Sequence, residues 1–439
     1  MSEIVSEIKC AKSAALKLAT LDTETKNKAL KAMAKALDEN RSKVLEANAK
    51  DVTATEMMAE KGDISDALVK RLKVTDEKTS GMIEGILDVI KLEDPVGETM
   101  SALKLDEDLI LYQIRCPIGM LGVIFESRPD VVPQILALCL KSGNGVAFKG
   151  GSEAINSNRA LFDILTTAAG SAGIPKEAFV MMETREDISQ ILELHEYIDL
   201  LIPRGSNSFV QYIQNNTKIP VLGHAAGICH IYIDDEADID VALKVTLDSK
   251  IQYPAVCNAV ETLLVNSKIA KDFLPKIVDL YTENGVEVRV DGRSKASISK
   301  NVKDATAEDW DTEYNDLIIS IKVVDDMKEA INFINTHGSH HTDAIITANK
   351  NKQIEFVRSV DSADVFINAS TRFADGYRYG KGAEVGISTN KIHSRGPVGM
   401  EGLMIYKYVL VGNGQVVKDY VGKDAKKFIH EPLNKKYKM

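Results

Sequence analysis

The sequence predicts an α/β protein that contains two doubly wound parallel sheets and a small antiparallel extension. The main observation is a series of short apolar runs that alternate with helical patterns from Gly119 onward, followed by a second such series after Cys257. Strands that alternate with helices are typical of βαβ units, in which helices cover both faces of a parallel sheet. The length of 439 residues supports about two or three domains, at roughly 100 to 200 residues per domain.

Residues 1–94 contain no proline, and their composition predicts a helical region. It is rich in Ala, Lys, Glu, Leu and Met, which favour helices. Leu30, Met33, Ala34 and Leu37 recur at helical spacing, so one face of the expected helix is apolar.

Two groups of apolar runs predict the strands of the two sheets. The first comprises residues 120–126, 145–150, 178–183, 197–203 and 228–234, and the second comprises residues 261–266, 316–324, 343–348 and 363–368. Short continuous apolar runs are typical of parallel strands buried on both faces. We expect the two halves to join near residues 223 to 260.

Residues 106–119 and 402–414 fit neither series, because apolar and polar side chains alternate along them. This alternation predicts antiparallel strands. Two interpretations of these strands are equally good: an oligomerisation arm, and an ordinary edge hairpin of one domain. We expect a homo-oligomer, with dimer and tetramer both open.

The charge and hydropathy of the chain argue against several classes of partner. The formal net charge is -10, and no Lys/Arg cluster interleaves with aromatic residues, which opposes binding to nucleic acid or to anionic membranes. No apolar stretch approaches the roughly 20 residues needed to cross a bilayer. The N-terminus lacks the basic and apolar regions of a signal peptide, so we expect a cytoplasmic protein.

The cysteines lack the close spacing of a disulfide framework or a zinc site, so we predict that most of them are free thiols and that the chain binds no metal. For Cys10, Cys139 and Cys229 we expect small buried hydrophobic side chains. Cys257 differs, since it follows Pro254 and lies just before an expected strand. Its neighbour Asn258 could donate a hydrogen bond to a developing oxyanion. The local pattern leaves a nucleophile and a core residue equally open, and spacing assigns no histidine as a partner.

Two strand ends turn through glycine into an expected helix start, at residues 146–154 and 201–210. Ser152 and Ser206 are good N-caps, and a helix start after glycine exposes backbone N–H groups to a phosphate. Lys149 could add a cation. Such turns more often reflect turn and cap chemistry alone, and neither a Gly-x-Gly-x-x-Gly nor a nucleotide-triphosphate loop occurs.

Several colinear motifs resemble the gamma-glutamyl phosphate reductases, a branch of the aldehyde dehydrogenase superfamily. They are QYPAVCNAVETLLV, GMLGVIFESRPDV, AFKGGSEAINSN, IPRGSNSFV, WDTEYNDLIISIKVVDDMKEAI, HTDAIIT and HSRGPVGMEGL. The resemblance extends in order from the N-terminal helices to about residue 410. It implies an aldehyde dehydrogenase-like fold with a cofactor-binding domain (1–105 and 118–225), a catalytic domain (226–395), and an oligomerisation arm with a C-terminal segment (106–117 and 403–439).

The resemblance also implies an activity, the NADPH-dependent reduction of L-glutamyl 5-phosphate to L-glutamate 5-semialdehyde. This is the second step of proline synthesis from glutamate. Cys257 falls at the family's nucleophile, whose thiolate would form a thioester that accepts hydride from NADP(H). Association with glutamate 5-kinase is consistent with a reactive acyl phosphate, although no docking motif is visible.

Further site residues are carried over by the same resemblance. Lys149 matches a lysine that contacts the adenosine ribose or its phosphate, and Gly205 and Ser206 match a helix start that receives the pyrophosphate. Glu313 resembles the glutamate that holds the nicotinamide ribose. Ser127 occupies the segment in which hydrolytic relatives carry an oxyanion-binding asparagine, so other donors, such as the Cys257 backbone N–H, are expected to stabilise the oxyanion.

No glutamate lies between Val221 and Ile233, where hydrolytic aldehyde dehydrogenases place their general base. Hydrolysis needs that base to activate water, whereas an acyl-phosphate enzyme must exclude water and admit phosphate. The sequence therefore favours phosphate release over hydrolysis. A hydrolytic aldehyde dehydrogenase is the second interpretation, and a non-catalytic scaffold, which would have no need of Cys257, is the third.

The substrate carries a phosphate, a carboxylate and an ammonium group, which calls for arginines and one acidic partner. Candidates are Arg128, Arg378 and Arg395 for the anions and Glu384 for the ammonium group. For each arginine a surface ion pair is an equally good interpretation.

Overall fold

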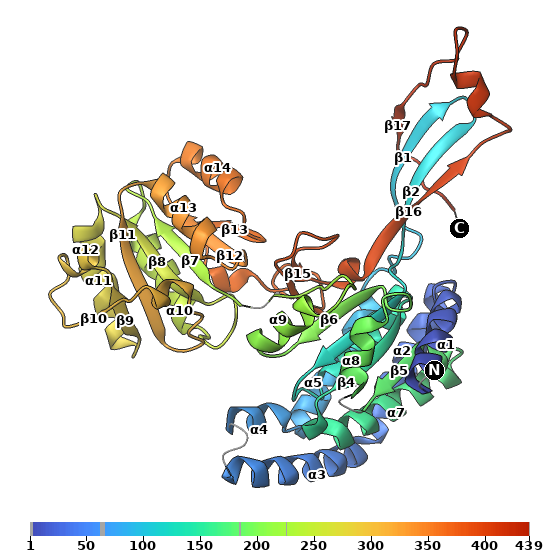
Figure 1. Cartoon of the computed structure of the whole chain (residues 1–439), viewed down its shortest axis with the longest axis horizontal. Coiled ribbons are helices and arrows are strands. Elements are labelled where there is room, and N and C mark those ends of the chain that lie inside the picture. The colour runs from blue at the N-terminus through green and yellow to red at the C-terminus, as the bar shows by residue number, and fades with distance from the viewer. Residues whose placement is uncertain (1–2, 62–65, 184–185, 225, 439) are drawn as a thin grey trace. The chain divides into compact units, whose positions relative to one another are not determined.

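The computed structural model describes residues 3–61, 66–183, 186–224 and 226–438 (Figure 1). The chain forms two compact units. The first contains residues 1–205, 213–221 and 399–439, and the second contains residues 206–212 and 222–398.

The N-terminal part of the first unit is helical, as the sequence predicts. Its helices are α1 (Glu3–Leu18), α2 (Thr23–Glu39), α3 (Arg41–Glu60), α4 (Asp66–Leu72) and α5 (Asp76–Lys91). The side chain of Asp22 caps α2 by accepting a hydrogen bond from Thr25 N. The predicted apolar face of α2 is buried.

Cys10 contradicts its predicted burial, because the side chain is exposed on α1. Ile8, Ala11 and Leu18 form the buried face of this helix, and position 10 points about 200° away from Ile8 at 100° per residue. A helix that packs on one side leaves that position in solvent.

A four-stranded parallel sheet forms the centre of the first unit, in the order β5-β4-β3-β6. Its strands are β3 (Met120–Phe125), β4 (Gly145–Gly150), β5 (Phe179–Met182) and β6 (Leu200–Arg204). The associated helices are η1 (Ser152–Ala154), η2 (Lys176–Ala178), α6 (Val131–Ser142), α7 (Ile155–Ser171), α8 (Glu186–Glu193) and α9 (Asn207–Asn215), the last of which crosses between the two units in sequence. These strands coincide with predicted apolar runs.

The second unit contains a seven-stranded parallel sheet in the order β10-β9-β11-β8-β7-β12-β13. Its strands are β7 (Cys229–Ile233), β8 (Val260–Asn266), β9 (Glu287–Val290), β10 (Lys303–Asp304), β11 (Ile318–Val324), β12 (Thr342–Ile346) and β13 (Asp364–Ile367). β7, the last run of the first series in the chain, pairs here with β8 and β12. The sequence did not indicate the short strands β9 and β10.

Helices cover both faces of this sheet, as expected for a doubly wound fold (Figure 1). They are α10 (Ile239–Ile251), α11 (Ala270–Glu283), α12 (Gly292–Lys295), α13 (Met327–His337) and α14 (Lys350–Ser359). Alternate strand residues enter separate cores. Leu263 packs with α10 and α11, whereas Leu264 packs with α13 and α14. Such two-sided burial explains why these strands read as continuous apolar runs.

A four-stranded antiparallel sheet forms the arm of the first unit, in the order β16-β2-β1-β17. Its strands are β1 (Thr99–Asp106), β2 (Leu109–Pro117), β16 (Met404–Val411) and β17 (Glu431–Leu433). The arm thus begins before residue 106, the boundary that the sequence suggested. The sequence pattern did not predict β1, because Ala102 is its single buried residue and the strand therefore has no clear apolar face.

The remaining elements are short. They are η3 (Glu308–Asp311), η4 (Thr371–Phe373), η5 (Met400–Leu403), η6 (Val417–Tyr420) and the two-stranded sheet of β14 (Gly386–Ser388) with β15 (Gly396–Val398). Across the described ranges, none of the helices combines the length and apolar character needed to span a membrane.

Candidate active site

Cys257 lies at the edge of the seven-stranded sheet where neighbouring strands begin. β7 starts at Cys229 and pairs in parallel with β8, which starts at Val260, and with β12, which starts at Thr342. Since parallel strands begin at the same edge, the residues that precede β8 and β12 converge there. Cys257 and His341 are two of these residues.

The backbone of Cys257 is fixed by the segment that leads into β7. Cys229 Sγ donates a hydrogen bond to Cys257 O at 3.2 Å. A Cβ atom built at Gly227 would lie 2.1 Å from Cys257 O and 2.4 Å from Cys257 Cα. Glycine at position 227 therefore allows the close approach that holds the cysteine in place.

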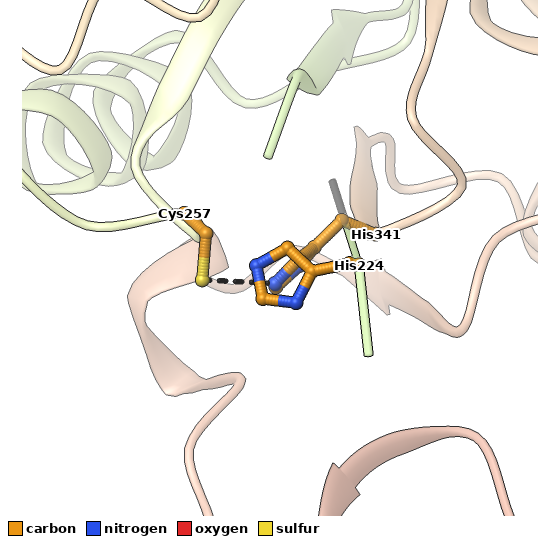
Figure 2. Close-up of side chains that lie close together, drawn as sticks. All are labelled: His224, Cys257 and His341. Carbon is orange, nitrogen blue, oxygen red and sulfur yellow. Dashed lines mark hydrogen bonds between the residues drawn. The ribbon is translucent and has the colours of Figure 1, made fainter. Parts of the chain in front are cut away.

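His341 forms a hydrogen bond with the Cys257 thiol, with 3.1 Å between Nε2 and Sγ (Figure 2). The other ring nitrogen, Nδ1, lies 2.8 Å from Thr342 Oγ1. Burial, reinforced by the nearby His224, lowers the pKa of His341 well below its ordinary value of 6.5. A neutral imidazole at this distance is able to accept the thiol proton.

His224 is the second histidine at the thiol (Figure 2). Its ring meets the ring of His341 edge to face, with 5.0 Å between centroids, and its Nδ1 donates to Ile387 O at 3.0 Å. It belongs to the segment in which hydrolytic relatives are expected to carry a glutamate. The structure therefore brings imidazole groups, and not a carboxylate from this segment, to the thiol.

Asn258 joins the cysteine turn to the turn η4. Its Nδ2 donates to Ala374 O at 2.7 Å, and the side chain is buried. Asn258 Oδ1 is buried without a partner among the described residues. The oxyanion role of Asn258 stays a prediction.

Arg372, which the sequence reasoning missed, lies in η4 and is only 8% exposed. Its Nε donates to Gln252 Oε1 at 2.9 Å, and no carboxylate in the described parts of the chain forms an ion pair with it. Burial and then the charge of Arg378 lower the pKa of Arg372, while Cys257 acts in the opposite direction. The charges of Asp375 and Asp248 also raise its pKa, but burial has the larger effect. A buried cation that forms no ion pair is costly, so this position favours an anionic ligand near Cys257.

The arginines selected from the sequence differ in how they are held. Arg378 is exposed and forms an ion pair with Asp375 at 3.4 Å. Arg395 pairs with Asp361 at 3.2 Å and donates further to the carbonyl oxygens of residues 361, 362 and 389. Those contacts give Arg395 a structural role.

Two further substrate candidates occupy different units. Arg128 is exposed just before α6, in the first unit. Glu384 accepts a hydrogen bond from Gly376 N at 2.8 Å, in the loop that also carries Arg378 in the second unit. Their proposed substrate contacts stay predictions.

Two predicted cofactor residues of the first unit, Lys149 and Gly205, lie at the carboxyl edge of its parallel sheet, as does Ser127, which the sequence groups with the catalytic residues. Ser127 follows β3, Lys149 is the last residue but one of β4, and Gly205 follows β6. Lys149 Nζ donates to Gly150 O at 2.6 Å, and Ser127 has a φ of 42° and donates from N and Oγ to the Glu153 carboxylate. Ligands of open α/β sheets bind at this edge.

Glu313 and the start of α9 lie together in the second unit. Asn207, the residue after Ser206, donates from Nδ2 to Glu313 Oε2 at 2.7 Å. A helix start can donate backbone hydrogen bonds to a phosphate, and a carboxylate accepts hydrogen bonds from ribose hydroxyls. The chemistry of these residues fits a nicotinamide dinucleotide.

A hydrogen-bond network holds the loop that carries Glu313. Asp309 accepts from Arg289 at 2.6 Å, from Tyr314 at 2.7 Å and from Thr306 N at 2.6 Å. Burial alone would raise the pKa of Asp309, but these donors outweigh it and lower the pKa to about 2. The carboxylate is charged at neutral pH and fixes the loop.

All five cysteines are free thiols, whereas the sequence predicted this of most of them. Cys139 and Cys229 are fully buried, and burial raises the pKa of both. Cys257 therefore differs from these two in being partly exposed beside two imidazoles.

Comparisons with known proteins agree with this geometry. The aldehyde dehydrogenase family model matches residues 2–304. The gamma-glutamyl phosphate reductase of Methanosarcina mazei is 62% identical over 99% of this chain and 99% of its own, and that of Natronomonas pharaonis is 51% identical over 98% of each.

Solved structures show the same relationship. The gamma-glutamyl phosphate reductase of Thermotoga maritima is 41% identical, with a TM-score of 0.91 over 94% of this chain and 100% of that one. An acetylating aldehyde dehydrogenase from Geobacillus thermoglucosidasius shares the fold at 17% identity, with a TM-score of 0.64 over 94% and 97% of the two chains. The chain belongs to the aldehyde dehydrogenase family and, within it, to the gamma-glutamyl phosphate reductases.

Proposed function

We propose that this chain catalyses the NADPH-dependent reduction of L-glutamyl 5-phosphate to L-glutamate 5-semialdehyde and phosphate, in the synthesis of proline from glutamate. The observation that carries the proposal is the contact of 3.1 Å between Cys257 Sγ and His341 Nε2, in a chain 62% identical to an enzyme named for this reduction. A thiol next to a neutral imidazole is suited to attack an activated acyl group.

The first step forms a thioester. His341 Nε2 takes the Cys257 proton as the sulfur attacks the acyl carbon and the bond from carbon to the phosphate oxygen breaks. The proton on His341 then passes to the departing phosphate, so that the imidazole returns to its neutral form. Burial of His341 favours this neutral form at both ends of the step.

The second step reduces the thioester. The nicotinamide cofactor, when bound, supplies the hydride for this step. The backbone N–H of Cys257 and the side chain of Asn258 are our candidate donors to the oxyanion, with Ser127 the position that lacks the asparagine of hydrolytic relatives. Collapse of this oxyanion breaks the carbon–sulfur bond, releases the aldehyde and leaves the Cys257 thiolate. A proton from solvent, passed through His341 Nε2, then restores the thiol.

Arg372 is our first candidate for binding an anionic group of the substrate. It is buried, it has no carboxylate partner in the described ranges, and its pKa responds to Cys257. Arg378 is the second candidate, because its charge acts on Arg372 and its own side chain is exposed. Glu384, on the same loop, is the candidate for the substrate ammonium group, while Arg128 and Arg395 rank lower.

We propose NADP(H) as the cofactor within the nicotinamide class that the family uses. Lys149 would contribute a cation to the adenosine ribose phosphate, Gly205 and Ser206 would receive the pyrophosphate at the start of α9, and Glu313 would hold the nicotinamide ribose. The contact between Asn207 and Glu313 supports the pairing of the last two positions.

We propose that the arm joins subunits of a homo-oligomer. β16 is an edge strand, and Ile405, Tyr406, Tyr408 and Leu410 on it are 42 to 62% exposed. Exposed apolar edge strands are prone to pair with another chain. The size of the oligomer stays open between dimer and tetramer.

Location and a protein partner are further proposals. Free thiols are typical of a reducing compartment, which supports the cytoplasm. Association with glutamate 5-kinase stays a prediction. Sedimentation of the two purified enzymes mixed and apart would test it, and unchanged boundaries in the mixture would remove it.

The reverse reaction tests the proposed function. Purified enzyme is given glutamate semialdehyde and NADP with and without inorganic phosphate, alongside Cys257→Ala. We expect continuous NADPH formation only with both phosphate and Cys257. Turnover without phosphate would identify a hydrolytic aldehyde dehydrogenase, and no turnover under either condition would favour a different substrate or a scaffold.

A further inference from the structure

The nucleophile and two histidines form a cluster with the composition of a metal site. His224, Cys257 and His341 each contribute one ligand atom, and these atoms lie within 4.8 Å of one another (Figure 2). The chain separates Cys257 from His341 by 84 residues, so spacing in the sequence could not reveal the cluster. Thiolate and imidazole are ligands that Zn²⁺ prefers.

Both imidazoles are oriented by hydrogen bonds at Nδ1. His224 Nδ1 donates to Ile387 O, and because a carbonyl only accepts, the lone pair of His224 lies on Nε2. His341 Nδ1 contacts Thr342 Oγ1, while its Nε2 faces Cys257 Sγ. Metal-binding histidines commonly donate their second ring nitrogen to a carbonyl or a similar acceptor, which fixes the tautomer.

We infer that this cluster binds Zn²⁺ or a similar thiophilic divalent cation through Cys257 Sγ and the two imidazoles. Zinc bonds of about 2.3 Å to sulfur and about 2.0 to 2.1 Å to nitrogen require only small movements from the present separations. On binding, the Cys257 thiol releases its proton to solvent, and the metal replaces the hydrogen bond to His341. Water or another small ligand takes the fourth position.

The bound cation is coordinated by the sulfur atom that attacks the substrate, so the enzyme is inactive until the cation dissociates. The same bond protects the thiol from oxidation and alkylation. Binding itself does not depend on the identity of the substrate. A second cluster of acidic groups, Asp234 to Glu236, does not offer the same chemistry, because Lys352 already forms ion pairs with all three carboxylates.

Metal binding is tested on the purified chain after treatment with a chelator. Zn²⁺ is titrated in competition with a chromophoric chelator, and Co²⁺ is used to detect thiolate-to-cobalt charge-transfer absorption in the near ultraviolet. We expect one equivalent per chain, about tenfold or more weaker in His224→Ala and His341→Ala, with the charge-transfer band lost in Cys257→Ala. Exposed His195 and Cys10 provide matched controls, since His195→Ala and Cys10→Ala should bind like the unmodified chain.

Alkylation of the unmodified chain measures protection of Cys257 by Zn²⁺ without any substitution, so this experiment does not depend on whether a histidine variant folds. Iodoacetamide labelling is followed at each cysteine by mass spectrometry, with and without micromolar Zn²⁺. We expect Zn²⁺ to protect Cys257 and not Cys10, and EDTA to restore labelling. Equal labelling of Cys257 with and without Zn²⁺, or binding that survives loss of Cys257 and both histidines, would overturn the inference.

Discussion

His341 Nε2 lies 3.1 Å from Cys257 Sγ, although the two residues are 84 positions apart in the chain. They meet because β8 and β12 both pair in parallel with β7, one on each side of it, and each residue precedes one of these two strands. The contact supplies the thiol with a base that the sequence reasoning did not assign.

Replacing His341 by Gln should reduce kcat by about 100-fold to 10,000-fold, the range that general acid–base catalysis contributes. The apparent KM for the acyl phosphate should change little, because the imidazole acts on the Cys257 proton and not on substrate binding. Steady-state kinetics across pH 6 to 9 would measure this. A variant that kept kcat but raised KM would assign His341 to binding instead, and His195→Ala serves as the control.

Replacing Arg372 by Ala should raise the apparent KM for phosphate in the reverse reaction by about 10-fold to 100-fold, and the KM for NADP by much less. The reason is that the substitution removes the buried guanidinium that would pair with the phosphate, so the bound anion loses its cationic partner. Arg395→Ala is the matched comparison. Because Arg395 is held by Asp361 and by carbonyl oxygens, its loss should mainly lower thermal stability. If Arg395→Ala raised the KM for phosphate and Arg372→Ala mainly lowered thermal stability, Arg395 would be the substrate-binding residue and Arg372 the structural one.

Lys149→Ala should weaken the binding of NADPH more than the binding of NADH, because the 2′-phosphate of NADPH carries the charge that Lys149 would neutralise. We expect KM for NADPH to rise by about tenfold, with little change for NADH. Kinetics with both cofactors measure the ratio. An equal rise in the KM for NADPH and for NADH would show that Lys149 does not bind the 2′-phosphate.

Asp309→Asn should lower the free energy of unfolding by about 1 to 2 kcal/mol at pH 7. The folded-state pKa of Asp309, about 2, lies below its ordinary value of 3.8. The carboxylate therefore stabilises the fold fully above pH 3.8, and this contribution is lost as the pH falls towards 2. Urea unfolding at pH 7 and at pH 3.5 should show the difference between variant and parent shrinking on acidification, with exposed Asp424→Asn as control.

Tyr408→Lys should shift the oligomer towards smaller species, because Tyr408 is 62% exposed on the edge strand β16. Sedimentation velocity at several concentrations measures the change. Leu16→Lys, at a residue 71% exposed on α1, is the control and should leave the oligomer intact. An unchanged distribution in the Tyr408 variant would remove β16 from the subunit contact.

The sequence predicted most of the sheets because parallel strands buried on both faces produce apolar runs, as in Leu263 and Leu264 of β8. It did not indicate β9 and β10, which are short and lie towards one end of the sheet. Cys257 was recognised by resemblance and not by local pattern. His341 and Arg372 could have been suspected only by asking which residues precede neighbouring parallel strands or follow them in short turns, since their roles arise from contacts across the fold.

The most direct test of the account is a single-turnover experiment on Cys257. Enzyme is mixed with glutamate semialdehyde and NADP without phosphate, quenched at acid pH and digested for mass spectrometry. We predict about one NADPH per active site and a glutamyl thioester on the Cys257 peptide, which disappears with continued NADPH formation once phosphate is added. An unmodified Cys257 peptide during NADPH formation, or a thioester that decays equally fast without phosphate, would contradict thioester release by phosphate.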